Sequence, residues 1–165
     1  MVFSPSSSII CENRKIISWN AEPLQNALDH HLLPVTYGDV VFDRSLGGTI
    51  LSTEDLFVYL AEHLTPQRIL LAGIDRGVWA DFPTNKKILE QLSPLSVKNI
   101  STNLHESLAI DVTGGMAQKV ILMSSLVEKY PAIQVVIFSG IKSGSITQAL
   151  RGHSPGTSIK QINLV

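Results

Sequence analysis

The stretch GGMAQKVILMSSLVEKYPAIQVVIFSG, residues 114–140, predicts the fold class of this chain. Its first part has apolar side chains every three or four residues, which is the spacing of one face of an α-helix. These apolar positions are Met116, Val120, Met123, Val127 and Tyr130. The run IQVVIF that follows is apolar at every position but Gln134, as in a strand that is buried on both faces of a sheet. A helix that leads into such a strand is typical of α/β proteins.

The residues before this stretch continue the alternation of helices and strands. STEDLFVYLAEHL, residues 52–64, predicts a helix capped by Ser52 or Thr53, and RILLAG, residues 68–73, predicts a buried strand. Nearer the start, the sequence predicts a hairpin of SSIIC and KIISW, then a helix and a strand. The helix is predicted over residues 22–30 and the strand over residues 33–37. Two short extended segments, GDVVFD and GGTI, follow them.

The remaining segments complete the predicted fold. GVWADFP is interpreted as an extended piece, and residues 86–110 as a loop or small insertion, because they contain Pro94 and are rich in Ser and Asn. SGIKSGSITQALRG predicts a loop, a short helix and a glycine stop, and GTSI a last strand. We therefore expect a three-layer αβα sandwich with a mainly parallel sheet.

Composition restricts the class of protein. The chain has 165 residues, of which 44% are hydrophobic and 16% charged, so we expect one globular domain over residues 1–165. The formal net charge is −1 and the basic residues are scattered, which argues against a nucleic-acid partner. The apolar runs are far shorter than the ~20 residues that span a bilayer, and the first residues lack the pattern of a secretory signal. We expect no membrane association.

The single cysteine, Cys11, excludes an internal disulfide and a zinc site made of cysteines. It fits a reducing compartment, so the cytoplasm is the expected location. The five histidines show no metal-ligand spacing, and no protein-bound metal site is predicted.

The segment DVTGGMAQK, residues 111–119, is the first candidate site. Free amides at a helix start favour an anion, and the glycine pair would let a phosphate oxygen approach the backbone. Lys119 lies one turn further and could reach the same anion. The alternative is that Asp111 or Thr113 is an ordinary cap and the glycines only make a tight turn.

Three further turns follow strands. In YGDVVFD, Gly38 would permit close backbone approach and Asp39 could orient an ammonium or hold a metal's water, or the pair is a turn with a solvated Asp. Asp43 is interpreted as part of a surface turn. AGIDRGVW and FSGIKSG would line the same sheet edge, because parallel topology brings strand ends together.

The ordered set PVTYGDVVFD, GGTILSTEDL, ILLAGIDRGVWADFP, DVTGGMAQKV, VVIFSG and GTSI resembles the C-terminal part of the isopentenyl phosphate kinases, which belong to the amino acid kinase superfamily. The resemblance runs over nearly the whole chain. YGD with a second Asp after it, together with DVTGGM and its lysine, is its most specific part.

The resemblance implies ATP-dependent, magnesium-assisted phosphorylation of isopentenyl phosphate to isopentenyl diphosphate. Gly38 would contact the phosphoryl acceptor, and Asp39 would be a catalytic polar organiser near the transferring group. Asp75 would lie along the nucleotide, and Gly115 and Lys119 would meet the ATP phosphates, with Lys119 catalytic. A kinase for another small phosphate or phosphonate, like the fosfomycin-phosphorylating relatives, and a nucleotide-binding module without catalysis are the alternatives.

Two departures from the family pattern carry expectations. GIDRGV stands where many relatives have a turn of the TDVDGV type, so Arg76 replaces an acid. The lysine strand, glycine-rich loop and acceptor-gripping histidine of the family's N-terminal lobe have no counterpart in this sequence. We therefore expect a domain truncated at its N-terminus and a weak kinase by itself, whose partner would be a separate N-terminal lobe or a second copy.

Overall fold

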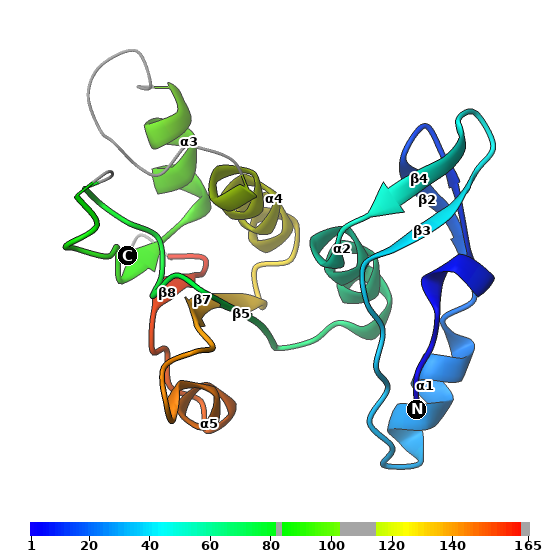
Figure 1. The fold of residues 1–165 in the computed structure, drawn as a ribbon. Helices are drawn as coiled ribbons and strands as arrows, with labels where there is room; N and C mark the ends of the chain where they lie inside the picture. The colour runs from blue at the N-terminus through cyan, green and yellow to red at the C-terminus, as the bar shows by residue number, and fades with distance from the viewer. Residues whose placement is uncertain (82–83, 103–114, 163–165) are drawn as a thin grey trace. The chain divides into compact units, whose positions relative to one another are not determined.

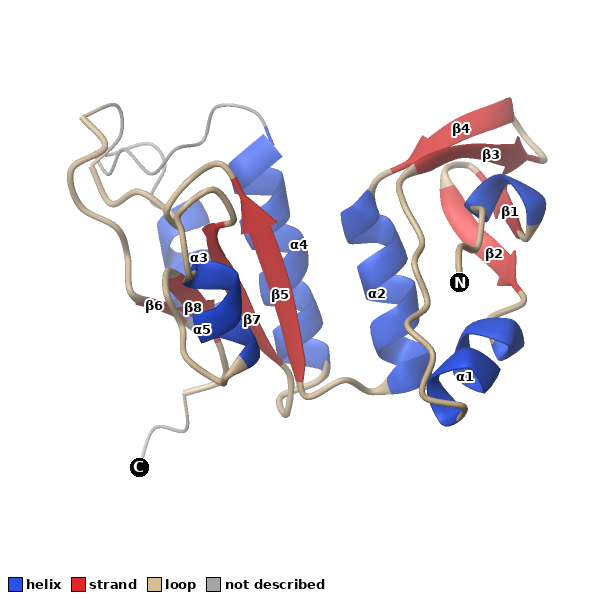
Figure 2. Cartoon of the chain, turned by 60° about the horizontal axis from the view of Figure 1, so that its bottom comes forward, coloured by secondary structure: helices blue, strands red, loops and turns tan. Residues whose placement is uncertain are grey.

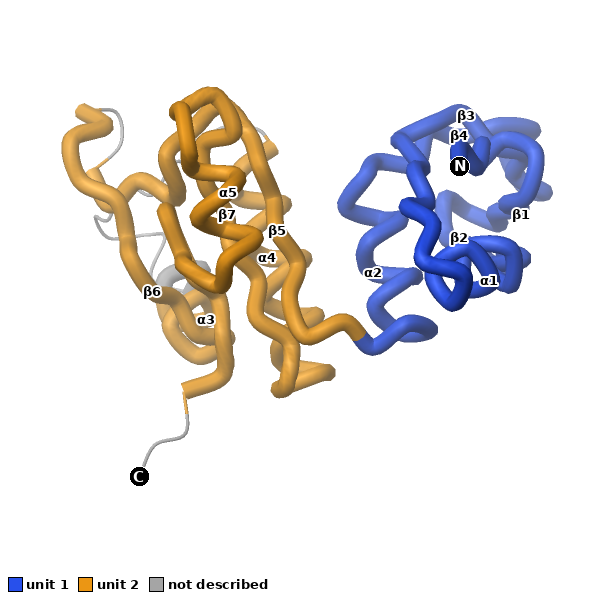
Figure 3. Tube along the Cα trace, turned by 90° about the horizontal axis from the view of Figure 1, so that it is seen from below, with its two compact units in different colours: residues 1–65 blue, residues 66–165 orange. Residues whose placement is uncertain are grey.

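The computed structural model describes residues 1–81, 84–102 and 115–162 (Figure 1). It divides into two compact units, Met1–Thr65 and Pro66–Val165, called the first and second unit below (Figure 3). Each unit combines one four-stranded sheet with helices, which confirms the α/β class. No helix in the described ranges has the length and apolar character needed to cross a bilayer.

The first unit contains a mixed sheet with the strand order β2-β1-β3-β4. β1 and β2 form one antiparallel hairpin, β3 and β4 form another, and β1 pairs with β3 in parallel. The elements are η1 (Pro5–Ser7), β1 (Ile9–Glu12), β2 (Lys15–Trp19), α1 (Glu22–Asp29), β3 (Asp39–Asp43), β4 (Gly47–Leu51) and α2 (Thr53–Leu64). The predicted cap of α2 is confirmed, because Ser52 and Asp55 form a capping box.

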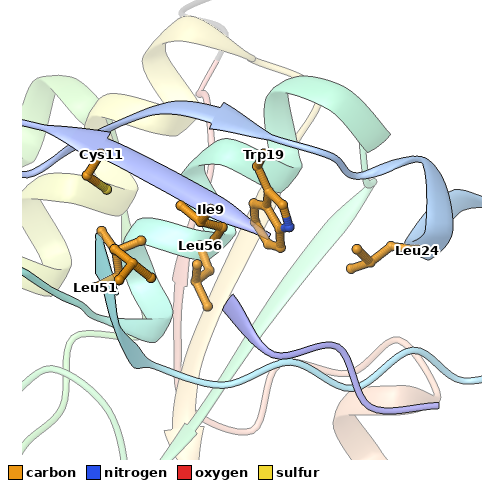
Figure 4. Close-up of a cluster of buried hydrophobic side chains, with 7 residues drawn as sticks. Ile9, Cys11, Trp19, Leu24, Leu51 and Leu56 are labelled. Carbon is orange, nitrogen blue, oxygen red and sulfur yellow. The ribbon is translucent and has the colours of Figure 1, made fainter. Parts of the chain in front are cut away.

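The core of the first unit lies between one face of this sheet and the two helices (Figure 4). Side chains alternate along each strand, so every second residue of β1 and β3 is buried. The buried cluster consists of Ile9, Cys11, Trp19, Val41 and Leu51 from the sheet, Leu24 from α1 and Leu56 from α2.

Asp43 is buried between the two hairpin turns, so its interpretation as part of a surface turn is wrong. Only 3% of its surface is exposed. The carboxylate accepts hydrogen bonds from the backbone amides of Asn13, Arg14, Ser45 and Leu46, at 2.7–3.2 Å. Burial raises the pKa of Asp43, but the four amides together outweigh burial and hold the pKa below its usual value. Asp43 therefore connects the β1–β2 turn to the β3–β4 turn.

The second unit contains the sheet β5-β7-β8-β6, with helices on both faces (Figure 2). β5 and β7 are parallel, β7 and β8 antiparallel, and β8 and β6 parallel. The elements are β5 (Arg68–Gly73), β6 (Gln91–Leu92), α3 (Pro94–Thr102), α4 (Gly115–Lys129), β7 (Gln134–Ser139), α5 (Ser145–Leu150) and β8 (Thr157–Ile159). The predicted helices and strands at α4, β7, α5 and β8 are thereby confirmed.

β7 is buried on both faces, as its apolar run VVIF predicts. Val136 and Phe138 pack with Ala149 of α5 and with Leu70 on one face of the sheet. The alternate residues of β7 are also buried, and α4 packs against β7 and β8 on the other face. The second unit is therefore a three-layer αβα arrangement.

Three local predictions differ from the structure. The first sheet is mainly antiparallel, because the short turns after β1 and β3 allow only antiparallel hairpins, whereas two of the three neighbouring strand pairs in the second sheet are parallel. Residues 33–37 form no strand; Val35 makes only an isolated bridge with Val2. Part of the segment read as a loop is the helix α3, where Pro94 occupies the first turn, in which its missing N–H costs nothing. Ser93 and Ser96 cap this helix reciprocally.

Candidate functional site

The candidate site of the second unit lies at the carboxyl edge of the parallel strands β5 and β7. Gly73 is paired in register with Ser139, so the loops that follow the two strands start side by side. The Ser139 hydroxyl donates to the Ile74 carbonyl at 3.0 Å, and the Gly140 amide donates to the Gly73 carbonyl at 2.8 Å. These bonds fix the two loops to each other, which agrees with the expectation that AGIDRGVW and FSGIKSG share one edge.

Ser145 fixes the second of these loops at the start of α5. Its buried hydroxyl donates to the carbonyls of Ser139 and, at 2.7 Å, Lys142. Gly144 precedes it with φ at +80°, a conformation that favours glycine. The loop of residues 140–144 is thus fixed at the sheet edge, and the side chain of Lys142 in this loop is exposed.

The turn that contains Asp75 is fixed to β8 by a close backbone approach. The Val78 amide donates to the Thr157 hydroxyl at 2.8 Å in a buried position. A Cβ on Gly156 would stand 2.2 Å from the Ile137 carbonyl oxygen and 2.6 Å from that of Arg76. Only glycine allows this crossing, and it anchors the residues just after Asp75.

Asp75 itself contacts a neighbouring aromatic side chain. The indole Nε1 of Trp79, a buried residue, donates to Asp75 Oδ1 at 3.3 Å. Asp75 is half-buried, and this bond fixes the direction of its carboxylate. The second carboxylate oxygen has no hydrogen bond among the described residues.

Gly115 and Lys119 lie at the same edge of the second unit. α4 leads into β7 through a short turn and packs against it, so its first residue lies near the carboxyl end of β7 (Figure 2). A Cβ on Gly115 would meet no atom of the described residues within 4 Å, so these residues leave space on that side of its backbone. Lys119 follows one turn later and is half-buried. Asp111, Thr113 and Gly114 lie outside the described residues, so the reading of those residues as an ordinary cap and turn stays a prediction.

Two large apolar side chains are exposed at this edge, and the sequence analysis assigned them no role. Ile74 is 80% exposed and Ile141 is 73% exposed. Ile74 follows Gly73, the last residue of β5, and Ile141 follows Gly140, the first residue after β7, so the repeated Gly-Ile pair in AGID and SGIK was the available signal.

Gly38 and Asp39 belong to the first unit. A Cβ on Gly38 would lie 3.0 Å from the Leu51 carbonyl oxygen, so the close approach here is to the end of β4. Asp39 accepts hydrogen bonds from the Ser4 hydroxyl at 3.2 Å, the Ser6 amide at 3.1 Å and the Val40 amide at 2.9 Å. The carboxylate is therefore bonded to the turn of η1.

The pKa of Asp39 lies below its usual value. Hydrogen bonds stabilise its charged form and lower the pKa; the side chain and amide of Ser6 contribute most, followed by the Val40 amide and the Ser4 hydroxyl. Desolvation raises the pKa but is outweighed by these donors. Asp39 is thus a charged acceptor near neutral pH. Within residues 1–81, 84–102 and 115–162 there is no group of three or more His, Cys, Asp or Glu side chains that could hold a metal ion.

Comparison with known proteins identifies the family. The model of the amino acid kinase family matches residues 2–139. Isopentenyl phosphate kinase of Methanocaldococcus jannaschii is 32% identical over 155 residues, which are 94% of this chain and 55% of that protein. The enzyme of the same name from Methanothermobacter thermautotrophicus is 29% identical over 151 residues, 90% of this chain and 56% of that protein.

A solved isopentenyl phosphate kinase has the same fold as this chain, with a TM-score of 0.76 and 25% identity. The match covers 97% of this chain and 59% of that structure. The chain thus spans somewhat more than half the length of the relatives it matches. With most of its length matched by the family model and the same fold in a solved member, the chain belongs to the amino acid kinase family.

Proposed function

We propose that this chain supplies the ATP-binding part of a kinase that phosphorylates isopentenyl phosphate to isopentenyl diphosphate. The observation that carries the proposal is the convergence, at one edge of the second unit, of the open backbone at Gly115, the Lys119 helix turn and the two fixed loops after β5 and β7. The names of the relatives support the choice of acceptor. The substrates and cofactors named below belong to this proposal.

Lys119 and Gly115 would bind the phosphates. A lysine ammonium neutralises phosphate charge, and the amides at a helix start donate to phosphate oxygens. The open space around Gly115 fits such an approach. Phosphoryl transfer needs alignment and neutralisation of spreading negative charge, and these two residues would provide part of both.

The loops after β5 and β7 would hold the rest of the nucleotide. The purine base would cover the exposed side chains of Ile74 and Ile141 and remove their apolar surface from water. Burial of apolar surface stabilises a complex by ~25 cal/mol per Å². Asp75 would lie along the nucleotide with one carboxylate oxygen held by Trp79. Bound Mg-ATP supplies the transferable phosphoryl group, and its magnesium would be carried mainly by the phosphates.

Gly38 and Asp39 would serve the acceptor. We propose that Gly38 contacts the acceptor phosphate through its backbone and that Asp39 is the polar organiser of this region. The three donors on the Asp39 carboxylate support a role in which it fixes the η1 turn and the start of β3. The fosfomycin-type acceptor remains an alternative substrate within the same reaction class.

Isothermal titration calorimetry with Mg-ATP tests the nucleotide assignment. The parent chain should bind, and Lys119→Ala should bind about 10- to 100-fold more weakly, since a hydrogen bond to a charged group contributes about 1.5–3 kcal/mol. Lys129→Ala is the matched control, because Lys129 lies at the opposite end of the same helix. Absence of binding by the parent, or equal binding by Lys119→Ala and Lys129→Ala, would refute the assignment.

Transfer is tested separately by ³¹P NMR with isopentenyl phosphate and with fosfomycin as acceptors. We expect slow formation of isopentenyl diphosphate by the chain alone and faster formation when the N-terminal lobe of the Methanocaldococcus jannaschii relative is added. Nucleotide binding without transfer to either acceptor in both conditions would favour a non-catalytic module.

A further inference from the structure

The second unit has a cavity of about 480 Å³ at the end of the sheet where β7 begins. It is lined by Gln134, by β6 and β8, and by the turn at residues 154–156. β7 runs six residues to the edge that carries the candidate nucleotide site, and a strand rises ~3.3 Å per residue. The cavity is therefore roughly 15–20 Å from that edge and separate from it.

The floor of the cavity is polar and has a fixed orientation. Gln134 Oε1 accepts from Arg68 Nε at 3.2 Å, and Arg68 is itself held by the carbonyls of Ala149 and His153. Because arginine only donates, the amide nitrogen of Gln134 must face the other way. It donates to the Ser158 hydroxyl at 2.8 Å and to the Ser154 hydroxyl at 3.4 Å.

This arrangement leaves two hydroxyl protons free to donate. A serine hydroxyl has one proton and two lone pairs, and the Gln134 amide uses one lone pair of Ser158 and one of Ser154. Ser158 is 6% exposed, so its hydroxyl bonds in a partly desolvated place. Two adjacent hydroxyl donors suit a carboxylate, since bonds to an ionised acceptor are the stronger ones.

The walls carry one charge of each sign. Glu90 and Lys160 both line the cavity, and their backbones flank the short β6–β8 pairing at its two ends, with the Ser158 amide donating to the Glu90 carbonyl and the Lys160 amide to the Leu92 carbonyl. Across the described part of the chain, neither side chain takes part in an ion pair or hydrogen bond. Both charges are thus available to a ligand.

We infer that this cavity binds a small zwitterion of the α-amino acid class. Its carboxylate contacts the Ser154 and Ser158 hydroxyls and the Lys160 ammonium, and its ammonium contacts Glu90. The cavity is large enough for an amino acid with a short side chain. The inference does not depend on the proposed kinase function, because it uses none of the residues assigned to nucleotide or acceptor.

The test is a titration of the ¹⁵N-labelled full chain, followed by amide chemical shifts, with glycine as the probe. Acetate and glycinamide each lack one of the two charges. Glycine should shift the amides of residues 90–91, 154 and 156–160 and bind at least tenfold more tightly than either comparison compound. Glu90→Gln should weaken glycine at least tenfold and leave acetate unchanged, whereas Ser158→Ala should weaken both.

The control variant is Glu12→Gln, which removes an exposed carboxylate of the first unit and should change nothing. The inference is overturned if glycine shifts no amide around the cavity. It is also overturned if glycine and acetate bind equally, or if Glu90→Gln binds glycine like the parent. Glu90 is exposed, so that variant tests the site even if Ser158→Ala perturbs the sheet.

Discussion

Replacement of Gly156 by alanine should destabilise the second unit strongly. The added Cβ would lie 2.2 Å from the Ile137 oxygen, 2.6 Å from the Arg76 oxygen and 2.9 Å from Phe138 Cα. Real Cβ contacts essentially never fall below 3.0 Å. All three neighbours are backbone atoms, so no side-chain rotation relieves the contact, and β8 must separate from β7 and from the Arg76 turn by roughly 0.8 Å.

The size of the effect follows from these contacts. Insertion of a methyl group into a well-packed place costs about 1–3 kcal/mol, and three backbone contacts place Gly156→Ala at the upper end. The separation also weakens the buried Val78–Thr157 hydrogen bond, a loss of about 1 kcal/mol. For a chain of this length, ~3 kcal/mol corresponds to a decrease in Tm of roughly 6–12 °C.

Urea unfolding followed by far-UV circular dichroism, with calorimetry for Tm, measures this change. Gly73→Ala is the matched control in the same unit, because its Cβ would meet nothing within 4 Å. It should stay within about 0.5 kcal/mol of the parent. If Gly156→Ala were also within that range, the close crossing of β7, β8 and the Arg76 turn would be refuted.

Three further substitutions test the first unit and the core. Asp43→Asn should lower the free energy of unfolding at pH 7, and the difference from the parent should shrink as the pH falls below about 4. The reason is that a carboxylate whose pKa is lowered by folding contributes stability above its unfolded pKa, and this stability is lost when the carboxylate is protonated. A difference that stays independent of pH between 7 and 2 in urea unfolding would contradict this. Ser52→Ala should cost about 1 kcal/mol through loss of the α2 capping box, measured by the same method, with no effect expected if the box does not form in solution. Phe138→Ala should cost about 3–5 kcal/mol by opening a cavity against Ala149, and a loss below about 1 kcal/mol would contradict the core assignment.

Much of the fold could be predicted because it depends on local patterns. The stripe of α4, the apolar run of β7 and the Ser52 cap each depend on neighbours a few residues apart. α3 was missed because Pro94 and its flanking serines signal both a loop and a helix start. The strand predicted over residues 33–37 failed because an apolar run becomes a strand only where a partner lies beside it.

The candidate site was predictable in part. The sequence indicated that the loops after two buried strands share one edge, and it indicated Gly115 and Lys119 as phosphate contacts, an assignment that remains our proposal. The sequence did not indicate that Ser139 and Ser145 fix those loops, because their acceptors are carbonyls brought near by the sheet and by α5. It also did not reveal that Asp39 bonds to Ser4 and Ser6, more than thirty residues away.

The sequence by itself determined the α/β class, most helices and strands, and the family resemblance, because these depend on periodicity and on short ordered motifs. Only the tertiary structure decided the role of Asp43, whose four amide donors come from two separate hairpin turns. It also decided that Gly156 must be glycine and that Gln134 lies on a polar floor. Such contacts join segments far apart in the chain, and their distances exist only after the sheet has formed.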